Sequence, residues 1–279
     1  MTRPAAITAL LCPLLAGCGD DAQAAPLRAV GEARLRQIES PGTGPSVAGL
    51  GWVRIPAGDY WIGTPSGERG REPGELPPTR VTVERELYVS RTEVPQLAYA
   101  ALVEGASWDL HAGPALPAHS TSWHDAVRFC EALDSLHPEW DFDLPTETEW
   151  EVAARGAVRA EARLLPFTCR DARIASEPAQ VLKGFAFFRE NSDGVLHECA
   201  SKNPNPIGLF DIHGSVYEWC RVDEAVHGPR GTAHLQDEPI RGGSYLSAYR
   251  DCRAGSRAWE RSERAIASIG FRVVCRRRR

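Results

Sequence analysis

The sequence of 279 residues predicts an irregular α+β domain that is rich in loops and has short strands and a few helices. Short β-rich runs recur between glycine and proline turns near both ends of the domain. Two helix-start signals of the capping-box type lie between these runs. The hydrophobic content of 43% and the charged content of 25% are ordinary for a soluble globular protein, and the length is sufficient to bury one substantial core.

The first 18 residues predict a bacterial lipoprotein signal peptide. Arg3 precedes an apolar stretch, residues 5–15, that is too short to span a bilayer as a mature helix. The stretch ends in Leu15-Ala16-Gly17-Cys18, which resembles the lipobox, so we expect lipidation of Cys18 and anchoring to the membrane. A plain signal peptide cut near Ala22-Gln23-Ala24 is the alternative. Either signal predicts export, and the lipidated form predicts attachment at the periplasmic side or the cell surface.

Residues 19–48 are rich in Ala, Gly, Pro and Ser and predict a flexible tether, and residues 49–276 form the expected domain. No later segment is apolar enough to be transmembrane. The formal charge of −5 gives no indication of a nucleic-acid partner. The basic run Arg276–Arg279 is interpreted as a solvated tail.

The domain opens with two β-rich runs between Trp52 and Gly63, split by a Pro-Ala-Gly-Asp turn, which predicts a hairpin. A loop rich in Gly, Pro and Glu follows over residues 64–78. Residues 80–84 and 87–89 alternate like strands.

Three helices are expected next. The first begins at Val94-Pro95 and runs to about Glu104, since proline suits the first helical turn. The second is capped by Ser122, has Asp125 three residues on, and extends through Leu136. The third follows Thr146, which forms a capping box with Glu149, and stops at Gly156. Residues 167–196 are expected to be loop-rich with short strands, and the remainder after residue 203 predicts strands separated by glycine turns.

The ordered motifs of the domain resemble the sulfatase-modifying-factor, or formylglycine-generating-enzyme, family across about 225 residues, 51–274. That resemblance implies an irregular variant of the C-type-lectin-like fold with short antiparallel strands. The motifs that carry it are Ile55-Pro56-Ala57-Gly58, Thr92-Glu93-Val94, Ser122-Trp123-His124-Asp125-Ala126, Leu144-Pro145-Thr146-Glu147, Gly208-Leu209-Phe210-Asp211, Glu218-Trp219, Arg241-Gly242-Gly243-Ser244-Tyr245 and Ile269-Gly270-Phe271-Arg272.

Most of these motifs are expected to be structural. Arg155, Arg257 and Arg272 are expected to form interior ion pairs with Glu149, Glu151 or Glu218, which keep register without implying chemistry.

In copper-dependent members of the family, two cysteines five positions apart follow the Gly-Gly-Ser-Tyr motif and bind Cu(I). Here the two positions are Ser247 and Cys252, and a serine hydroxyl cannot replace a thiolate for Cu(I). The segment from Cys252 to Arg257 also resembles a later arginine-containing strand of the family, in which case neither catalytic cysteine exists. Copper is therefore not expected. Ser247 and Cys252 are the remaining catalytic candidates.

Six cysteines remain outside the signal peptide, and an even count in an exported chain favours disulfides, although six cysteines permit fifteen pairings. The resemblance suggests a bond between Cys130 and Cys275. The expected partner of Cys252 is Cys220, which leaves Cys169 with Cys199.

A calcium loop of the family is matched here by Gly214, Ser215, Val216 and Glu218, where Ser215 replaces an asparagine. Calcium is thus the one cofactor that the resemblance leaves open. Iron-dependent relatives take histidines largely from an extra helical domain, and the scattered histidines here, with His119 and His124 the closest pair, do not predict an iron site. His124 is expected to be an exposed residue at a helix start.

The leading interpretation is a membrane-tethered protein whose groove binds a peptide, a partner protein or a small ligand without copper chemistry. The groove is expected near Trp61, Ser244, Tyr245, Ser247 and Tyr249. One alternative is a protein-modifying oxidoreductase that uses Cys252, Ser247 or a bound iron. The other is a purely structural component of the envelope.

Overall fold

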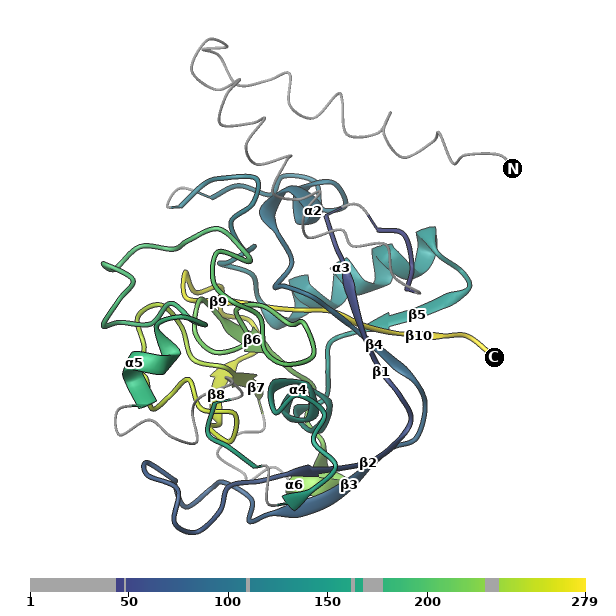
Figure 1. Ribbon diagram of the computed structural model, residues 1–279. Coiled ribbons are helices and arrows are strands. Elements are labelled where there is room, and N and C mark those ends of the chain that lie inside the picture. Colours follow the sequence, from purple (N-terminus) through teal and green to yellow (C-terminus); the bar gives the residue numbers. More distant parts are fainter. Residues whose placement is uncertain (1–43, 48, 109–110, 162–163, 168–177, 229–235) are drawn as a thin grey trace.

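A four-stranded antiparallel sheet joins the two ends of the domain in the computed structural model, which describes residues 44–47, 49–108, 111–161, 164–167, 178–228 and 236–279. Its strand order is β1-β4-β10-β5. The first strand pairs with β4, and the last strand, β10, lies between β4 and β5 (Figure 1). The strands are β1 (Trp52–Ile55), β4 (Leu87–Ser90), β5 (Trp140–Asp143) and β10 (Val274–Arg277).

The expected hairpin between Trp52 and Gly63 is wrong, although both of its strands exist. The second run, β2 (Gly58–Ile62), pairs with β3 (Thr79–Val83), whereas β1 pairs with β4. The Pro-Ala-Gly-Asp segment therefore turns the chain from one sheet into another. The β2–β3 ribbon lies at the lower edge of the molecule in Figure 1.

A third sheet has the order β8-β7-β6-β9. Its pairs are antiparallel except for β6 and β9, which run parallel. The glycine-separated strands expected after residue 203 are confirmed by these strands and by β10. The strands are β6 (Tyr217–Trp219), β7 (Asp237–Arg241), β8 (Ala258–Arg261) and β9 (Ile269–Gly270).

Both capping boxes are confirmed. In α3 (Trp123–Leu136) the Ser122 side chain accepts from the Asp125 N–H, and the Asp125 carboxylate accepts from the Ser122 N–H. Thr146 and Glu149 make the same pair of bonds at the start of α4 (Glu147–Ala154). Each cap contributes about 1 kcal/mol. The shorter helices are α2 (Gln96–Ala100), which ends earlier than expected, α5 (Pro178–Leu182) and α6 (Glu224–His227).

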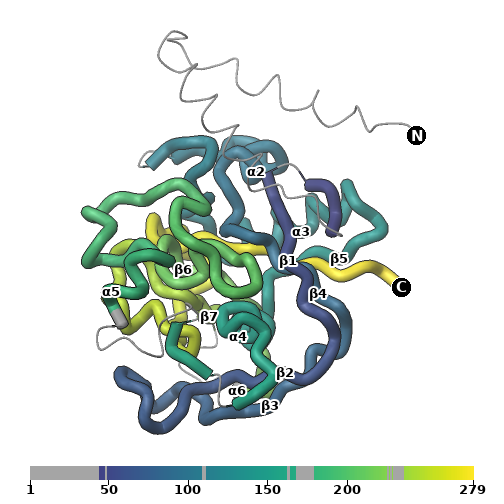
Figure 2. Tube along the Cα trace, in the orientation of Figure 1, coloured from purple at the N-terminus to yellow at the C-terminus, as the bar shows by residue number. Residues whose placement is uncertain are grey.

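Two apolar clusters form most of the core. One packs α3 against β5 and β10 and contains Phe129, Leu133 and Phe271. The other lies around α4, between the β2–β3 ribbon and β7, and contains Trp150. In the described part of residues 167–196 the one regular element is the helix α5, marked in Figure 2, rather than a strand.

Buried ion pairs connect α4 to the strands around it. Glu151 lies between Arg155 (Nε–Oε1, 2.7 Å) and Arg241 (Nη2–Oε2, 2.6 Å), and it also accepts the Gly63 N–H at 2.7 Å. One turn earlier, Glu147 accepts two hydrogen bonds from Arg257. The expected pair of Arg155 with Glu151 is confirmed, and Arg257 takes a partner that was not foreseen.

Candidate functional site

Ser247, the first of the two expected copper positions, closes a tight turn after β7. Its hydroxyl oxygen accepts the Ser244 N–H at 3.0 Å and lies 3.0 Å from the Ser244 hydroxyl oxygen. Its own N–H donates to the Ser244 carbonyl at 2.9 Å. The structure thus brings Ser244 and Ser247 together as expected, but the contacts of the Ser247 hydroxyl hold the turn.

Cys252, the second position, is fully buried. Its sulfur contacts the Ala248 carbonyl at 3.7 Å and packs in an apolar cluster with Phe167 and Phe188. Burial raises the pKa of the Cys252 thiol, and the charges of Asp251 and Glu190 raise it further. Because the thiolate is the form that binds metals and attacks electrophiles, this environment disfavours both roles. A hydroxyl engaged in a turn and a buried neutral thiol do not fit Cu(I).

Gly243 lies directly against Cys252. A Cβ atom at this position would lie 2.6 Å from the Cys252 sulfur, and the backbone there has a φ of 74°. Both constraints favour glycine. The Gly-Gly pair of the motif therefore makes room for a packed side chain.

The expected groove is not formed as one surface. Tyr245 is buried, and its ring lies edge-on to His111 with centroids 5.8 Å apart. Trp61 lies on β2, opposite Arg80 of β3, because β2 pairs with β3 and not with the strands of the first sheet. Of the five groove residues, Tyr249 lines a cleft, and Trp61, Ser244, Tyr245 and Ser247 are not among the residues that line it.

The cleft around Tyr249 has a volume of about 340 Å³. Its walls come from the loop after β2, from the segment before Phe167, and from the turn after β7. Sequence reasoning identified that first loop but gave it no function. The lining residues are Pro65, Gly67, Glu68, Arg69, Leu164, Pro166, Phe167, Tyr249 and Arg253.

A second polar site, buried around Glu93 just before α2, was also missed. Glu93 and Asp211 are buried there beside Glu218 and Arg272. No hydrogen bond of ordinary geometry reaches either carboxylate oxygen of Glu93. Burial raises the pKa of Glu93 well above its usual value, and Asp211 and Glu218 add to the rise, while Arg272 and the Ser215 hydroxyl oppose it. Three carboxyl groups that share one guanidinium favour a further cation or a proton.

Glu218, one of the expected calcium ligands, is occupied by other partners. Its carboxylate accepts two hydrogen bonds from Arg272, at 2.6 and 2.7 Å, and one from the Trp150 indole at 2.6 Å. The pair of Arg272 with Glu218 was expected.

The other expected calcium ligands lie in the same loop. The Gly214 N–H donates to the Gly242 carbonyl, and the Ser215 carbonyl accepts the Tyr245 N–H at 2.6 Å. The buried Val216 side chain packs beside Tyr245. A hard cation here therefore fits Glu93 and Asp211 better than Glu218.

Histidines do not assemble a metal centre in the described residues. His119 is buried and His124 is exposed at the start of α3, as expected for the latter. His213 is buried, and burial lowers its pKa to about 4, so it is neutral near pH 7. Among the described residues no group of three or more His, Cys, Asp or Glu side chains is arranged around one point. A cation at Glu93 and Asp211 thus needs hydroxyl, carbonyl or water oxygens as well.

Two of the expected disulfides are not formed. Cys130, Cys220, Cys252 and Cys275 carry free, buried thiols. Cys220 belongs to the cluster around Trp150, whereas Cys252 packs with Phe167, so their separate environments explain why this pair is absent. Cys130 and Cys275 share the cluster under α3 without a bond. Cys169 lies outside the described residues.

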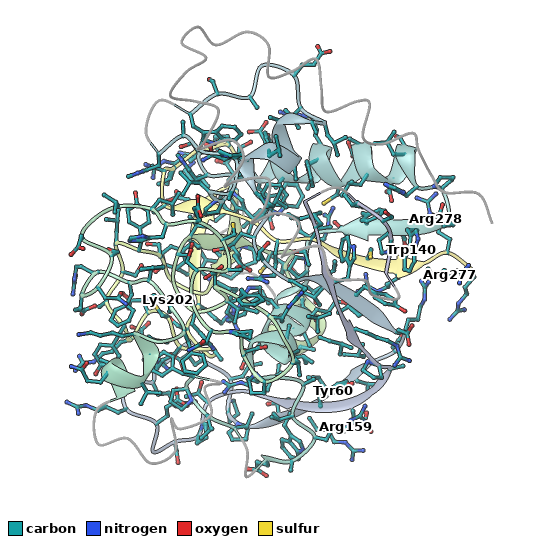
Figure 3. The ribbon with its side chains drawn as sticks, turned by 45° about the horizontal axis from the view of Figure 1, so that its top comes forward. Tyr60, Trp140, Arg159, Lys202, Arg277 and Arg278 are labelled. Carbon is teal, nitrogen blue, oxygen red and sulfur yellow. The ribbon has the colours of Figure 1, made fainter. Side chains whose placement is uncertain are left out.

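The C-terminal arginines lie at the edge of the first sheet. Figure 3 shows Arg277 and Arg278 beside Trp140, the residue that pairs with Arg277 in β5. Arg278 contacts Asp134 at 3.1 Å, and Arg276 pairs with Glu149. Acidic partners therefore offset part of this run.

In the described part of the chain no helix is long and apolar enough to cross a membrane. Cys18 and the signal segment lie outside the described residues.

The comparisons agree with the motifs. The family model for the sulfatase-modifying factor enzyme 1-like domain matches residues 40–277. A formylglycine-generating enzyme of Mus musculus is 26% identical over 92% of this chain and 85% of its own length. An inactive C-alpha-formylglycine-generating enzyme 2 of Mus musculus is 27% identical over 69% of this chain and 62% of its own length. The fold of PvdO from Pseudomonas aeruginosa matches with a TM-score of 0.66 and 24% identity, over 81% of this chain and 94% of that one.

Proposed function

Because this chain belongs to the sulfatase-modifying factor enzyme 1-like family, we propose that it is a non-oxidising member which binds a peptide, a partner protein or a small ligand in the cleft around Tyr249. The observation that carries the proposal is the state of the two copper positions. The Ser247 hydroxyl holds a turn with Ser244, and the Cys252 thiol is buried. The similarity to a mouse relative that is named inactive supports the same interpretation.

Copper-dependent oxidation is therefore expected to be absent. The purified protein, incubated with Cu(I), dioxygen and a peptide that carries one cysteine, should yield no aldehyde by mass spectrometry. It should also retain no stoichiometric copper after desalting, because one hydroxyl and one neutral thiol make a poor soft-ligand set. The mouse formylglycine-generating enzyme serves as the positive control. Aldehyde formation together with bound copper would establish the oxidoreductase alternative instead.

The second part of the proposal is a calcium ion held at Glu93 and Asp211. Hard oxygen ligands suit calcium, and a cation offsets the excess of buried carboxylates over guanidinium groups. The Ser215 hydroxyl opposes the rise in the pKa of Glu93 and would supply one further oxygen ligand. Glu218 keeps its bonds to Arg272 and Trp150. The role of the ion is structural, since it ties the segment before α2 to the loop before β6.

The third part is lipidation at Cys18, which is supported by the short apolar stretch and the Leu-Ala-Gly-Cys sequence. Bacteria that express the full chain and are grown with labelled palmitate should incorporate the label into it. Cys18→Ser should abolish incorporation, whereas Cys12→Ser should leave it unchanged, because only Cys18 ends the lipobox. Absence of label from the unsubstituted chain would support the plain signal peptide, and equal labelling of the two variants would exclude Cys18 as the lipidated residue.

A further inference from the structure

The cleft around Tyr249 combines apolar walls with a few charged groups. Tyr249 and Phe167 contribute rings, and Pro65, Leu164 and Pro166 contribute aliphatic surface. Its volume of about 340 Å³ lies at the lower end of the range of small-molecule sites. Such walls suit one ring or one branched chain of a ligand.

Arg253, one of the charged groups in its wall, is completely paired. The Arg253 guanidinium donates to Glu68, to both carboxylate oxygens of Glu75, and to the carbonyls of Gly70 and Arg250. A guanidinium has five N–H groups, so these bonds leave Arg253 no donor for a ligand. The Glu75 carboxylate also accepts from Thr64 and from the Glu72 N–H.

Glu68, by contrast, is paired through only one of its two carboxylate oxygens. Its side chain is 5% exposed, and one carboxylate oxygen, Oε1, accepts from Arg253 at 2.9 Å. The other oxygen, Oε2, is buried and accepts no hydrogen bond. Burial raises the pKa of Glu68, and the nearby Glu75 adds to the rise. A buried acceptor in a cleft wall lacks a donor, which a bound molecule can supply.

The positive charges around the cleft favour a neutral hydrogen-bond donor on the ligand over a cationic one. Arg69 lines the cleft and is exposed, and the Arg250 guanidinium lies 5.6 Å from the centre of the Tyr249 ring. These two cations disfavour a cationic group of the ligand at close range. A neutral N–H group carries no such penalty.

We propose that the cleft binds an uncharged N–H donor attached to an apolar ring or chain, with the N–H donated to Glu68 Oε2 and the apolar group against Tyr249 and Phe167. This inference rests on the proposed binding function and adds the chemistry of the ligand. An amide next to an aromatic side chain, in a peptide or in a free small molecule, has this arrangement.

Three probes and the full chain test the inference by titration calorimetry. N-acetyl-phenylalanine amide represents the small molecule, and the capped pentapeptide Gly-Gly-Phe-Gly-Gly represents the peptide. Both are expected to bind saturably, and tighter binding of the pentapeptide identifies the peptide as the source. The third probe, N-acetyl-N-methyl-phenylalanine dimethylamide, has no N–H and should bind roughly tenfold more weakly.

Variants add a second readout. Glu68→Ala and Tyr249→Ala should each weaken the two N–H probes about tenfold or more. Glu72→Ala, an exposed acid of the same loop, should leave both affinities unchanged. Phenethylammonium is added as a cationic comparison. Equal affinity of the probe without N–H, tighter binding of phenethylammonium than of the N–H probes, or no binding of either N–H probe overturns the inference. The copper assay does not involve these probes, so the two proposals fail separately.

Discussion

Replacing Glu151 by Gln is expected to lower the free energy of unfolding by about 3–5 kcal/mol, the usual cost of breaking a buried ion pair on one side. The substitution keeps the shape of the side chain and removes its charge. The guanidinium groups of Arg155 and Arg241, which are 1% and 0% exposed, then lose their shared anion. The expected loss is thus electrostatic.

The titration of Glu151 supports this magnitude. Burial opposes ionisation, but Arg155 and Arg241, with the Gly63 N–H, lower its pKa from 4.5 to about 2. A shift of this size corresponds to about 3 kcal/mol. Since the unfolded chain binds the proton more readily, this stability is fully present above pH 4.5 and is lost as the pH falls toward 2.

Urea unfolding followed by circular dichroism at pH 7 and at about pH 3 measures both effects. The difference between Glu151→Gln and the unsubstituted protein should be large at pH 7 and should shrink in acid. Glu131→Gln is the matched control, because Glu131 is exposed on α3 and its loss should change stability by less than about 0.5 kcal/mol. A difference between the Glu151 variant and its parent that is independent of pH would contradict the electrostatic explanation.

Local signals predicted local structure well. Ser122 with Asp125 and Thr146 with Glu149 set both helix starts, because a capping box depends on four consecutive residues. Pairing between strands depends on distant partners, and the turn between β1 and β2 was mistaken for a hairpin because both strands have distant partners instead.

The functional residues could be predicted from the sequence only where they lie within one short motif. The absence of the copper pair at Ser247 follows from the sequence alone. The cleft does not, because Arg253 holds Glu68 and Glu75 from 185 and 178 positions away. Glu93 gave a weak signal: it is a charged residue directly before the apolar Val94, and the structure buries both. That Glu93 lies close to Asp211 could not be predicted from the sequence, because only the fold brings these two distant residues together.

Calcium is expected to stabilise the protein, and Glu93→Gln is expected to remove that effect. Glu93 is fully buried, and neither of its carboxylate oxygens accepts an ordinary hydrogen bond. An ion that binds only the folded state stabilises it by about 2.7 kcal/mol at a hundred times Kd. Urea unfolding of the unsubstituted protein should therefore shift to higher urea in calcium, compared with a chelator.

The pH dependence without calcium has a definite sign. Burial, Asp211 and Glu218 raise the pKa of Glu93 well above its ordinary value of 4.5. Between the two values the folded state binds more protons than the unfolded state, so this group makes the protein less stable as the pH rises. Glutamine carries no charge, and Glu93→Gln should consequently be about 1–3 kcal/mol more stable than its parent in chelator at pH 7.

The ranking of the two proteins should therefore reverse with calcium. In chelator the Glu93→Gln variant unfolds at higher urea, and at saturating calcium the unsubstituted protein does, because only its carboxylate binds the ion strongly. Glu104→Gln, which removes an exposed acid shortly after α2, should respond to calcium as the parent does. An equal calcium shift in the Glu93 and Glu104 variants would exclude Glu93 as a ligand, and the buried acids would then have to be neutralised by a proton alone.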